Sequence, residues 1–214
     1  MQDSRRSIIA WSLYDWANSA FATTVMAGFF PIFFGSYWSN AATVQESTFY
    51  LGLANSLEAV IVAVLAPVLG AIADKGSYKM RFLATFSFMG CVMTGALWFV
   101  SQGNWQFAVL FYILATVGFS GSLIFYDALL PVVASEKKVD FVSSLGYGLG
   151  YIGGGLLFLV NVLMYLKPAV FGFADEVVAV KAAFVTVAIW WALFTIPILV
   201  FVKEPKDTVA LRAS

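Results

Sequence analysis

The stretch WSLYDWANSAF, residues 11–21, places a carboxylate, Asp15, and an amide, Asn18, inside an apolar run that continues to about Trp38. A run of that length is too long for the apolar part of a signal peptide and long enough to cross a bilayer, which takes about 20 apolar residues. A charged side chain at the centre of a membrane helix costs about 2.5–3.5 kcal/mol on insertion. Asp15 therefore lies near a membrane surface or serves a purpose inside the membrane.

The composition of the whole chain is that of a membrane protein. Of its 214 residues, 61% are hydrophobic and 11% are charged, and the mean hydropathy is +0.88. Soluble domains are about 45–50% apolar and about 25% charged. The long runs are apolar all round, unlike the helices of a soluble bundle, and they lack the short alternating segments of a membrane barrel. We therefore predict an all-α integral membrane protein.

Several function classes are excluded by residues that the chain lacks. There is no histidine and only one cysteine, Cys91, so no Cys/His metal cluster, Cys–His pair or intrachain disulfide can form. The formal net charge is zero and no basic stretch suits nucleic acid. We expect no cofactor, no metal, no nucleic-acid partner and no enzymatic activity.

Six apolar segments are long enough to span a bilayer. Glycine, proline, asparagine and charged residues mark the breaks between them. We expect a single six-helix transmembrane domain over residues 1–214, with spans at about 10–37, 48–73, 82–102, 106–134, 142–166 and 177–202.

The distribution of lysine and arginine predicts the orientation. With six spans, ten of the basic residues lie on one side of the membrane, and only Lys167 and Lys181 lie on the other. Loops rich in Lys and Arg stay in the cytoplasm. We therefore expect both termini to be cytoplasmic, in a protein of the bacterial plasma membrane.

The connection GAIADKGSYKMR, residues 70–81, combines small, acidic and basic residues. Its glycine permits close helix packing, and its carboxylate can pair with a base or with a helix N-terminus. The pattern resembles the signature of the major facilitator superfamily between its second and third spans, with the second glycine one residue early. An ordinary basic loop is the alternative. The resemblance implies a loop involved in conformational change. It is carried by Gly70, Asp74, Lys75, Gly76, Lys79 and Arg81.

Further segments resemble, in the same order, the vacuole-effluxer-like family of that superfamily. They are LYDWANSAF followed by FFPIFF (13–34), LGAIAD (69–74), FYDALLP (125–131) and SSLGYGLGYIGGG (143–155). The resemblance implies secondary transport, amino-acid efflux in some members, and half of a twelve-span fold built as a 3+3 inverted repeat. The chain resembles only the N-terminal half, although its initiating Met1 and short polar tail lead us to expect the full length. The arginine usual in the superfamily's fourth span is missing here.

A six-span half with both termini on one side can pair with a second copy of itself. The halves of such transporters are related by an axis along the membrane normal, so a parallel homodimer reproduces their arrangement. In the superfamily, spans two and five form the contact between halves. We therefore predict that the small residues of one copy's second span pack against those of its partner's fifth span, with packing inside one six-helix unit as the alternative. These residues are Ala59, Ala63, Ala66, Gly146, Gly150 and Gly154.

Three carboxylates fall within the predicted spans, and such groups are functional hypotheses by default. Helical spacing places amides or hydroxyls beside them. We expect Glu58, which lies deepest, to carry a proton. Alternatively, the three carboxylates make structural hydrogen bonds, and Tyr14 belongs to an aromatic belt at the membrane surface. The predicted substrate or proton site comprises Tyr14, Asp15, Asn18, Asn55, Glu58, Ser120 and Asp127.

Together these features predict a secondary transporter that moves a small polar solute by alternating access. It would act as a homodimer in the lipid bilayer, with its cavity on the twofold axis and with protons as a coupling ion. The alternative is one half of a split transporter that needs a different partner chain and is inactive alone.

Overall fold

The computed structural model describes residues 2–39, 43–75 and 78–204, without the side chains of Val44, Asp74 and Lys75. Throughout these residues the regular structure is helical. In chain order the elements are α1 (Arg5–Ala20), η1 (Phe21–Phe29), α2 (Phe30–Phe33), η2 (Phe34–Trp38), α3 (Val44–Lys75), α4 (Lys79–Ala96), η3 (Leu97–Phe99), α5 (Trp105–Val133), α6 (Val139–Leu166), η4 (Pro168–Phe171) and α7 (Glu176–Phe201).

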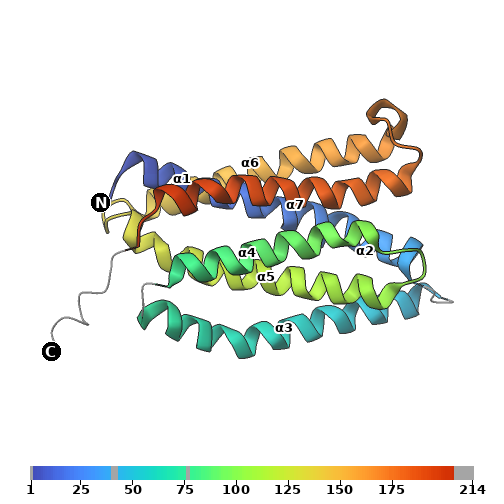
Figure 1. Ribbon diagram of the computed structural model, residues 1–214, viewed down its shortest axis with the longest axis horizontal. Coiled ribbons are helices and arrows are strands. Elements are labelled where there is room, and N and C mark those ends of the chain that lie inside the picture. Colours follow the sequence, from blue (N-terminus) through green and yellow to red (C-terminus); the bar gives the residue numbers. More distant parts are fainter. Residues whose placement is uncertain (1, 40–42, 76–77, 205–214) are drawn as a thin grey trace.

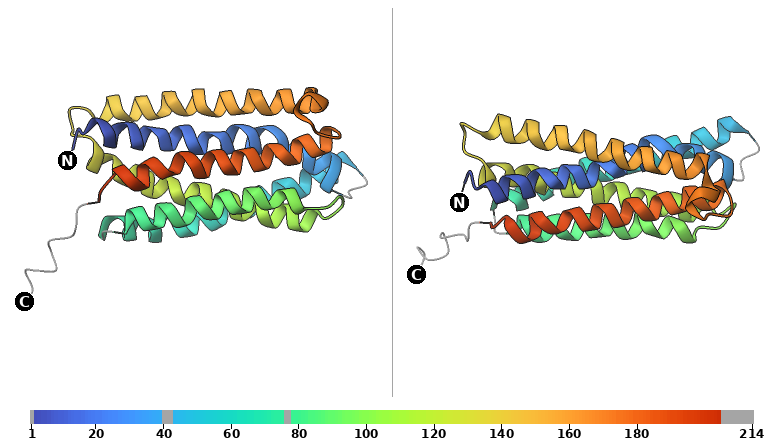
Figure 2. Two further views of the ribbon diagram at one scale, coloured as in Figure 1. Left: turned by 45° about the horizontal axis from the view of Figure 1, so that its top comes forward. Right: turned by 90° about the horizontal axis from the view of Figure 1, so that it is seen from above.

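The described part of the chain contains six helices that are long and apolar enough to cross a membrane, which confirms the predicted number of spans. They lie side by side in one bundle, and the start of α1 and the end of α7 lie at the same end of it (Figures 1 and 2). We call this the terminal end. The first span begins at Arg5, earlier than predicted, and the third runs from Lys79 to Phe99 rather than over 82–102. A helix can continue past its apolar stretch because charged side chains near its end reach the membrane surface.

The first span changes its winding along its length. The α-helix α1 gives way to a π-helical stretch, η1, a short α-helical turn, α2, and a second π-helical stretch, η2. Pro31 lies in α2 and has no backbone N–H to donate to a preceding carbonyl. Long π-helical stretches are rare in proteins and often lie beside functional sites. The wide winding begins directly after the polar residues of the opening motif.

Four helices form the centre of the bundle and two lie at its edges. The spans α1, α4, α5 and α7 pack against one another, α6 packs mainly on α1, and α3 packs mainly on α5. In Figure 1 the edge helices α3 and α6 lie on opposite sides. Stacked aromatic rings fill the centre: Phe30 lies on Tyr112 with ring centroids 3.9 Å apart, and Trp38 lies on Phe184 at 5.7 Å. Of the six spans, α3 has the smallest share of buried residues.

The glycines of α6 pack against α1 of the same chain. A Cβ atom added at Gly150 would lie 2.7 Å from the Oγ of Ser19, and one at Gly154 would lie 2.9 Å from the carbonyl oxygen of Ser19. Gly146 likewise faces Trp11. This packing contradicts our prediction that the row faces a second copy, because α1 already occupies that side of α6.

The small residues of α3 are placed differently. Ala59 and Ala63 are exposed, and Ala66 is half-buried. Their side of α3 is therefore open in the single chain, and their predicted contact with a partner stays a prediction.

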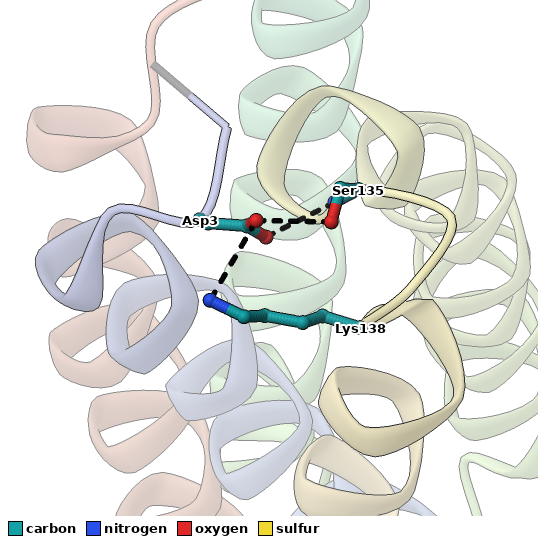
Figure 3. Close-up of polar contacts among 3 residues, drawn as sticks. All are labelled: Asp3, Ser135 and Lys138. Carbon is teal, nitrogen blue, oxygen red and sulfur yellow. Dashed lines mark hydrogen bonds and ion pairs between the residues drawn. The ribbon is translucent and has the colours of Figure 1, made fainter.

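The N-terminal arm is tied to the α5–α6 connection, as Figure 3 shows. The carboxylate of Asp3 accepts hydrogen bonds from the backbone N–H of Ser135 at 3.1 Å and from its hydroxyl at 2.9 Å, and it pairs with the ammonium of Lys138 at 3.6 Å. The backbone hydrogen bond from Ser135 contributes most to a pKa of Asp3 below its ordinary value. The start of α1 is therefore anchored to the connection between α5 and α6.

Candidate functional site

A cavity of about 400 Å³ opens between α1, α5 and α6. Its volume lies in the range of small-molecule sites. The first span contributes the polar residues of the opening motif and the start of η1. The cavity is lined by Trp11, Asp15, Asn18, Ser19, Ala22, Thr23, Phe119, Leu123, Tyr126, Asp127, Ser143, Tyr147, Gly150 and Tyr151.

Three residues of the predicted site meet in this cavity although they come from two helices. Asp15 and Asn18 come from α1, and Asp127 comes from α5. Asp15 is half-buried, Asp127 is exposed, and Asn18 is only 2% exposed. Asp15 lies ten residues after the start of α1, which corresponds to about 15 Å along the helix. Asp15 therefore lies well inside the span, and its carboxylate lines the cavity there.

Aromatic side chains form much of the cavity wall. Tyr147 and Tyr151, one turn apart on α6, are each 65% exposed, and their hydroxyls are 3.1 Å apart. Deeper in the wall, the rings of Trp11 and Tyr126 stack with centroids 4.2 Å apart, and the indole N–H of Trp11 donates to the carbonyl oxygen of Tyr126 at 3.1 Å. The tyrosine pair on α6 thus presents aromatic surface beside the two carboxylates.

Glycine brings α6 close to the carboxylate of α1. A Cβ atom added at Gly146 would lie 3.1 Å from the Oδ2 of Asp15 and 3.0 Å from the hydroxyl oxygen of Tyr126. Only a residue without a side chain fits there, so Asp15 and Tyr126 can lie on the same side of α6. The glycine row expected to hold two copies together instead shapes the cavity.

The cavity has an acidic wall without a basic residue. Neither α5 nor α6 contains a lysine or arginine, and the only ones in α1 are Arg5 and Arg6 at its start. Among the described residues there is also no group of three or more acidic, histidine or cysteine residues able to hold a metal ion. The two carboxylates therefore have no basic side chain beside them in the cavity, an arrangement that favours protons or cationic molecules.

Tyr14 differs from its predicted place in the site. Its side chain is fully buried, and its hydroxyl lies 2.6 Å from that of Ser87 on α4. The sequence did not show which neighbouring helix Tyr14 faces. In the structure its side chain points toward α4. Tyr14 therefore joins α1 to α4 behind the cavity.

A second polar group lies apart from this cavity, on α3 and α5. The carboxylate of Glu58 is half-buried and accepts a hydrogen bond from the hydroxyl of Ser120 at 3.4 Å. Asn55, one turn earlier on α3, is exposed. The structure thus brings together two predicted site residues, Glu58 and Ser120, away from Asp15 and Asn18.

The predicted conformational loop lies at the terminal end of the bundle. Gly70 is half-buried, and a Cβ atom added to it would contact nothing. Lys79 begins α4, and the guanidinium of Arg81 lies 5.7 Å from the centre of the Tyr78 ring. Gly76 lies outside the described residues, as do the side chains of Asp74 and Lys75. What this loop contributes to conformational change stays a prediction.

Glu204, which the sequence did not single out, contacts this loop. Its carboxylate accepts hydrogen bonds from the backbone N–H groups of Lys79 at 3.0 Å and Met80 at 3.4 Å, at the start of α4. Carboxylates are favourable at a helix N-terminus because the N–H groups there lack partners within the helix. The segment after α7 is therefore linked to the connection between α3 and α4.

Sequence reasoning missed part of the cavity wall. Trp11 and Tyr126 are absent from the predicted site, although Trp11 lies in the opening motif and Tyr126 directly precedes Asp127 in the FYDALLP motif. Tyr147 and Tyr151 are four residues apart and so share one side of a helix, but this spacing leaves open what they face. Aromatic residues stand next to the carboxylate in both motifs, on either side of Asp15 and directly before Asp127. This pattern was the available signal for an aromatic wall beside the two carboxylates.

The fold and the cavity define an integral membrane protein of the class that includes solute transporters. The chain belongs to the family described as vacuole effluxer Atg22 like, whose model matches residues 3–211. No solved structure gives a significant match.

Relatives of the chain are named as transporters or effluxers, not as enzymes. It is 38% identical over 201 residues to the uncharacterized MFS-type transporter YxiO of Bacillus subtilis, covering 91% of this chain and 46% of the relative. It is 23% identical to autophagy-related protein 22 of Pichia angusta, with 86% and 35% covered. It is 28% identical to the multi-drug resistance efflux pump PmrA of Streptococcus pneumoniae, with 87% and 43% covered. The chain thus spans less than half the length of these relatives.

Proposed function

We propose that this chain, as a single six-helix transmembrane domain, performs secondary active transport of a small polar solute by alternating access. Two parallel copies form the transporter, the solute path lies on their twofold axis, and protons drive the exchange. Both termini lie in the cytoplasm of a bacterial cell, as the excess of Lys and Arg at the terminal end favours. The family membership and the open acidic cavity support this function.

The observation that carries the proposal is the polar group on the outer side of α3. Asn55 is exposed and Glu58 is half-buried, near the middle of a membrane span. A charged residue that faces lipid there costs about 2.5–3.5 kcal/mol, and such residues normally face protein or a water-filled cavity. A second six-span unit beside α3 would remove both groups from lipid and enclose a polar path.

The exposed small residues of α3 suit such a partner. Ala63 is exposed, and neither Gly52 nor Gly70 has an atom within 4 Å of where a Cβ would lie. Helices with small residues on one side can approach closely in lipid. Because the glycine row of α6 is used within the chain, we place the partner's α6 against α3 through its outward side, which carries Gly148 and Ile152.

Glu58 is the proposed proton carrier. Its carboxylate has one hydrogen-bond donor, Ser120, on the neighbouring helix, and it lies on the side of α3 where the partner would bind. A carboxylate that exchanges its proton with each side in turn can couple a proton gradient to solute movement. Asp15 and Asp127, in the cavity, hold the solute.

Flux through the purified chain in liposomes tests this function. With an imposed pH gradient, we expect wild-type protein to move solute and to carry protons, detected with an enclosed pH dye. Glu58→Gln should uncouple solute movement from the gradient, and Asp15→Asn should abolish solute movement. Asp140→Asn, an exposed carboxylate at the start of α6, is the matched control. Flux that is the same in Glu58→Gln as in wild type would remove Glu58 from this role.

Crosslinking tests the partner surface. Ala63 and Ile152 lie at similar distances from the terminal end, on α3 and α6. In a Cys91→Ala background, Ala63→Cys with Ile152→Cys should give a crosslinked dimer in membranes. Ala63→Cys with Ile189→Cys, an equally deep and exposed position on α7, should not. Crosslinks of equal yield in both pairs would contradict the proposed surface.

The second candidate is pairing with a different six-span chain. It is favoured by the observation that this chain spans less than half the length of its relatives. Absence of flux and of crosslinked homodimer, with both restored by a second gene product, would establish this alternative.

A further inference from the structure

We infer that the cavity between α1, α5 and α6 binds an organic ammonium cation, held by Asp15 and Asp127 and by the faces of Tyr147 and Tyr151. The inference rests on the proposed transport of a small polar solute and names the chemical class of that solute.

The charge of the cavity is the first reason. Its two carboxylates come from different helices, and no lysine or arginine lines it. Asp127 is exposed and Asp15 is half-buried, so a molecule in the cavity can reach both. A solute with a carboxylate or phosphate group would meet repulsion there and find no basic side chain to bind. A cation of the size of a small amine would instead be attracted by both carboxylates, and more strongly in a membrane than in water.

The aromatic wall is the second reason. The rings of Tyr147 and Tyr151 meet edge to face, with centroids 4.9 Å apart and an angle of 84° between their planes. Both side chains are 65% exposed, so they offer ring surface to a bound molecule. Ammonium groups are attracted to the faces of aromatic rings by about 0.5–2 kcal/mol, and proteins recognise quaternary ammonium ligands in this way. A strongly hydrated metal ion gives up its water shell reluctantly and gains less from these ring faces than an organic ammonium group does.

Asn18 is the third and independent reason. This side chain lines the cavity, is only 2% exposed, and has no hydrogen-bond partner for its Nδ2 group among the described residues. A buried polar group without a partner costs about 1–3 kcal/mol. A rotation of this side chain would bring the Nδ2 group to an oxygen atom in the cavity, from the ligand or from a water held beside it. The ligand class is therefore an organic ammonium cation with an apolar body, and a water beside the ligand can serve Asn18.

Equilibrium binding to the full chain in nanodiscs tests the inference without requiring transport. The probe is radiolabelled benzyltrimethylammonium, whose charge does not change with pH. N,N-dimethylbenzamide is a neutral competitor of similar size, and phenylacetate is an anionic one. We expect saturable binding that unlabelled probe displaces and that neither competitor displaces at a hundredfold excess. Absence of saturable binding, or equal displacement by phenylacetate, would overturn the inference.

Variants locate the site. Asp15→Asn and Asp127→Asn should each weaken binding about tenfold or more, because each removes one charge near the cation. Asp140→Asn should bind like wild type, since it removes an exposed charge of the same helix bundle outside the cavity. Should a variant fail to fold, the competition series on the wild-type protein still decides the question. Full binding in the folded double variant Asp15→Asn/Asp127→Asn would refute the assignment.

The tyrosines separate a ring contact from a hydroxyl contact. Tyr147→Phe and Tyr151→Phe keep the rings and remove the hydroxyl pair, so binding should be retained within about twofold. Tyr147→Leu and Tyr151→Leu remove the rings and should weaken binding by about threefold to thirtyfold. Equal affinities in the Phe and Leu variants would contradict the aromatic contact.

The outcome is separable from that of the proposed function. Saturable cation binding without flux would support the ligand class and contradict transport by the chain alone. Flux of another solute without cation binding would support transport and overturn the ligand class.

Discussion

Two adjacent glycines of α6 provide a matched test of how α1 and α6 shape the cavity. A Cβ atom at Gly154 would lie 2.9 Å from the carbonyl oxygen of Ser19 and 3.1 Å from the Cγ2 of Thr23, whereas one at Gly155 would have no atom within 4 Å. The hydroxyl of Thr23 also donates to the carbonyl oxygen of Gly154 at 3.2 Å. Gly154→Ala therefore forces the α1 backbone away, and Gly155→Ala does not.

The expected difference follows from two free-energy terms. Replacing glycine by alanine inside a helix is favourable by up to about 1 kcal/mol, and this gain applies at both positions. Forcing a methyl group into a filled space typically costs about 1–3 kcal/mol, and here the obstacle is backbone rather than a flexible side chain. We therefore expect Gly154→Ala to be less stable toward unfolding than Gly155→Ala by about 1–3 kcal/mol.

Unfolding in mixed micelles with increasing dodecyl sulfate, followed by circular dichroism, measures this difference. Hydrogen exchange should place the loss in α1 and α6, because these helices meet at the substituted position. Free energies of unfolding that agree within about 0.5 kcal/mol for Gly154→Ala and Gly155→Ala would refute the close α1–α6 contact. The reverse order would refute it as well.

Three further predictions concern other contacts. Because hydrogen bonds lower the pKa of Asp3, its anchoring is present above the ordinary value of 3.8 and is lost as the pH falls through the lowered pKa. A spin label attached at Glu136→Cys should become more mobile on acidification. With Asp3→Asn added, the label should be mobile already at neutral pH. Equal mobility of the label in both proteins at every pH would contradict this prediction. Tyr14→Phe should lower the free energy of unfolding by about 1–3 kcal/mol, because it leaves the buried hydroxyl of Ser87 without a partner, yet leave cation binding unchanged. Loss of binding without loss of stability would return Tyr14 to the site. Glu204→Gln should cost about 1 kcal/mol and speed hydrogen exchange at the start of α4, because a weaker acceptor remains there; unchanged exchange would exclude this contact in the membrane.

The number of spans could be predicted because hydropathy and length decide whether a segment crosses a membrane. The helix ends could be predicted less well, since charged residues such as Arg5 and Arg6 sit on a helix that continues past its apolar part. The winding of η1 could not be predicted, because phenylalanine, alanine and threonine in its sequence are compatible with an ordinary α-helix.

Helical spacing predicted which residues share one side of a helix, but not which helix they face. The row of Gly146, Gly150 and Gly154 was correctly grouped, yet it faces α1 and not a second copy. Asp15 and Asp127 were predicted to share one site with Glu58, and only the packing of α1 beside α5 and α6 shows that these two aspartates line a cavity that Glu58 does not line. For Glu58, the sequence did not show that α3 lies at the edge of the bundle.

A mixing experiment tests whether two copies of this chain form one transport path. Wild-type chain and the Asp15→Asn variant are combined in equal amounts, dissociated, reassociated and reconstituted, and the initial rate of solute flux is measured. If every active unit needs two intact copies, the rate should fall to roughly one quarter of the wild-type rate, because random pairing leaves one dimer in four without the variant. A rate of about one half at the same total protein would show that each copy works alone and would contradict the account.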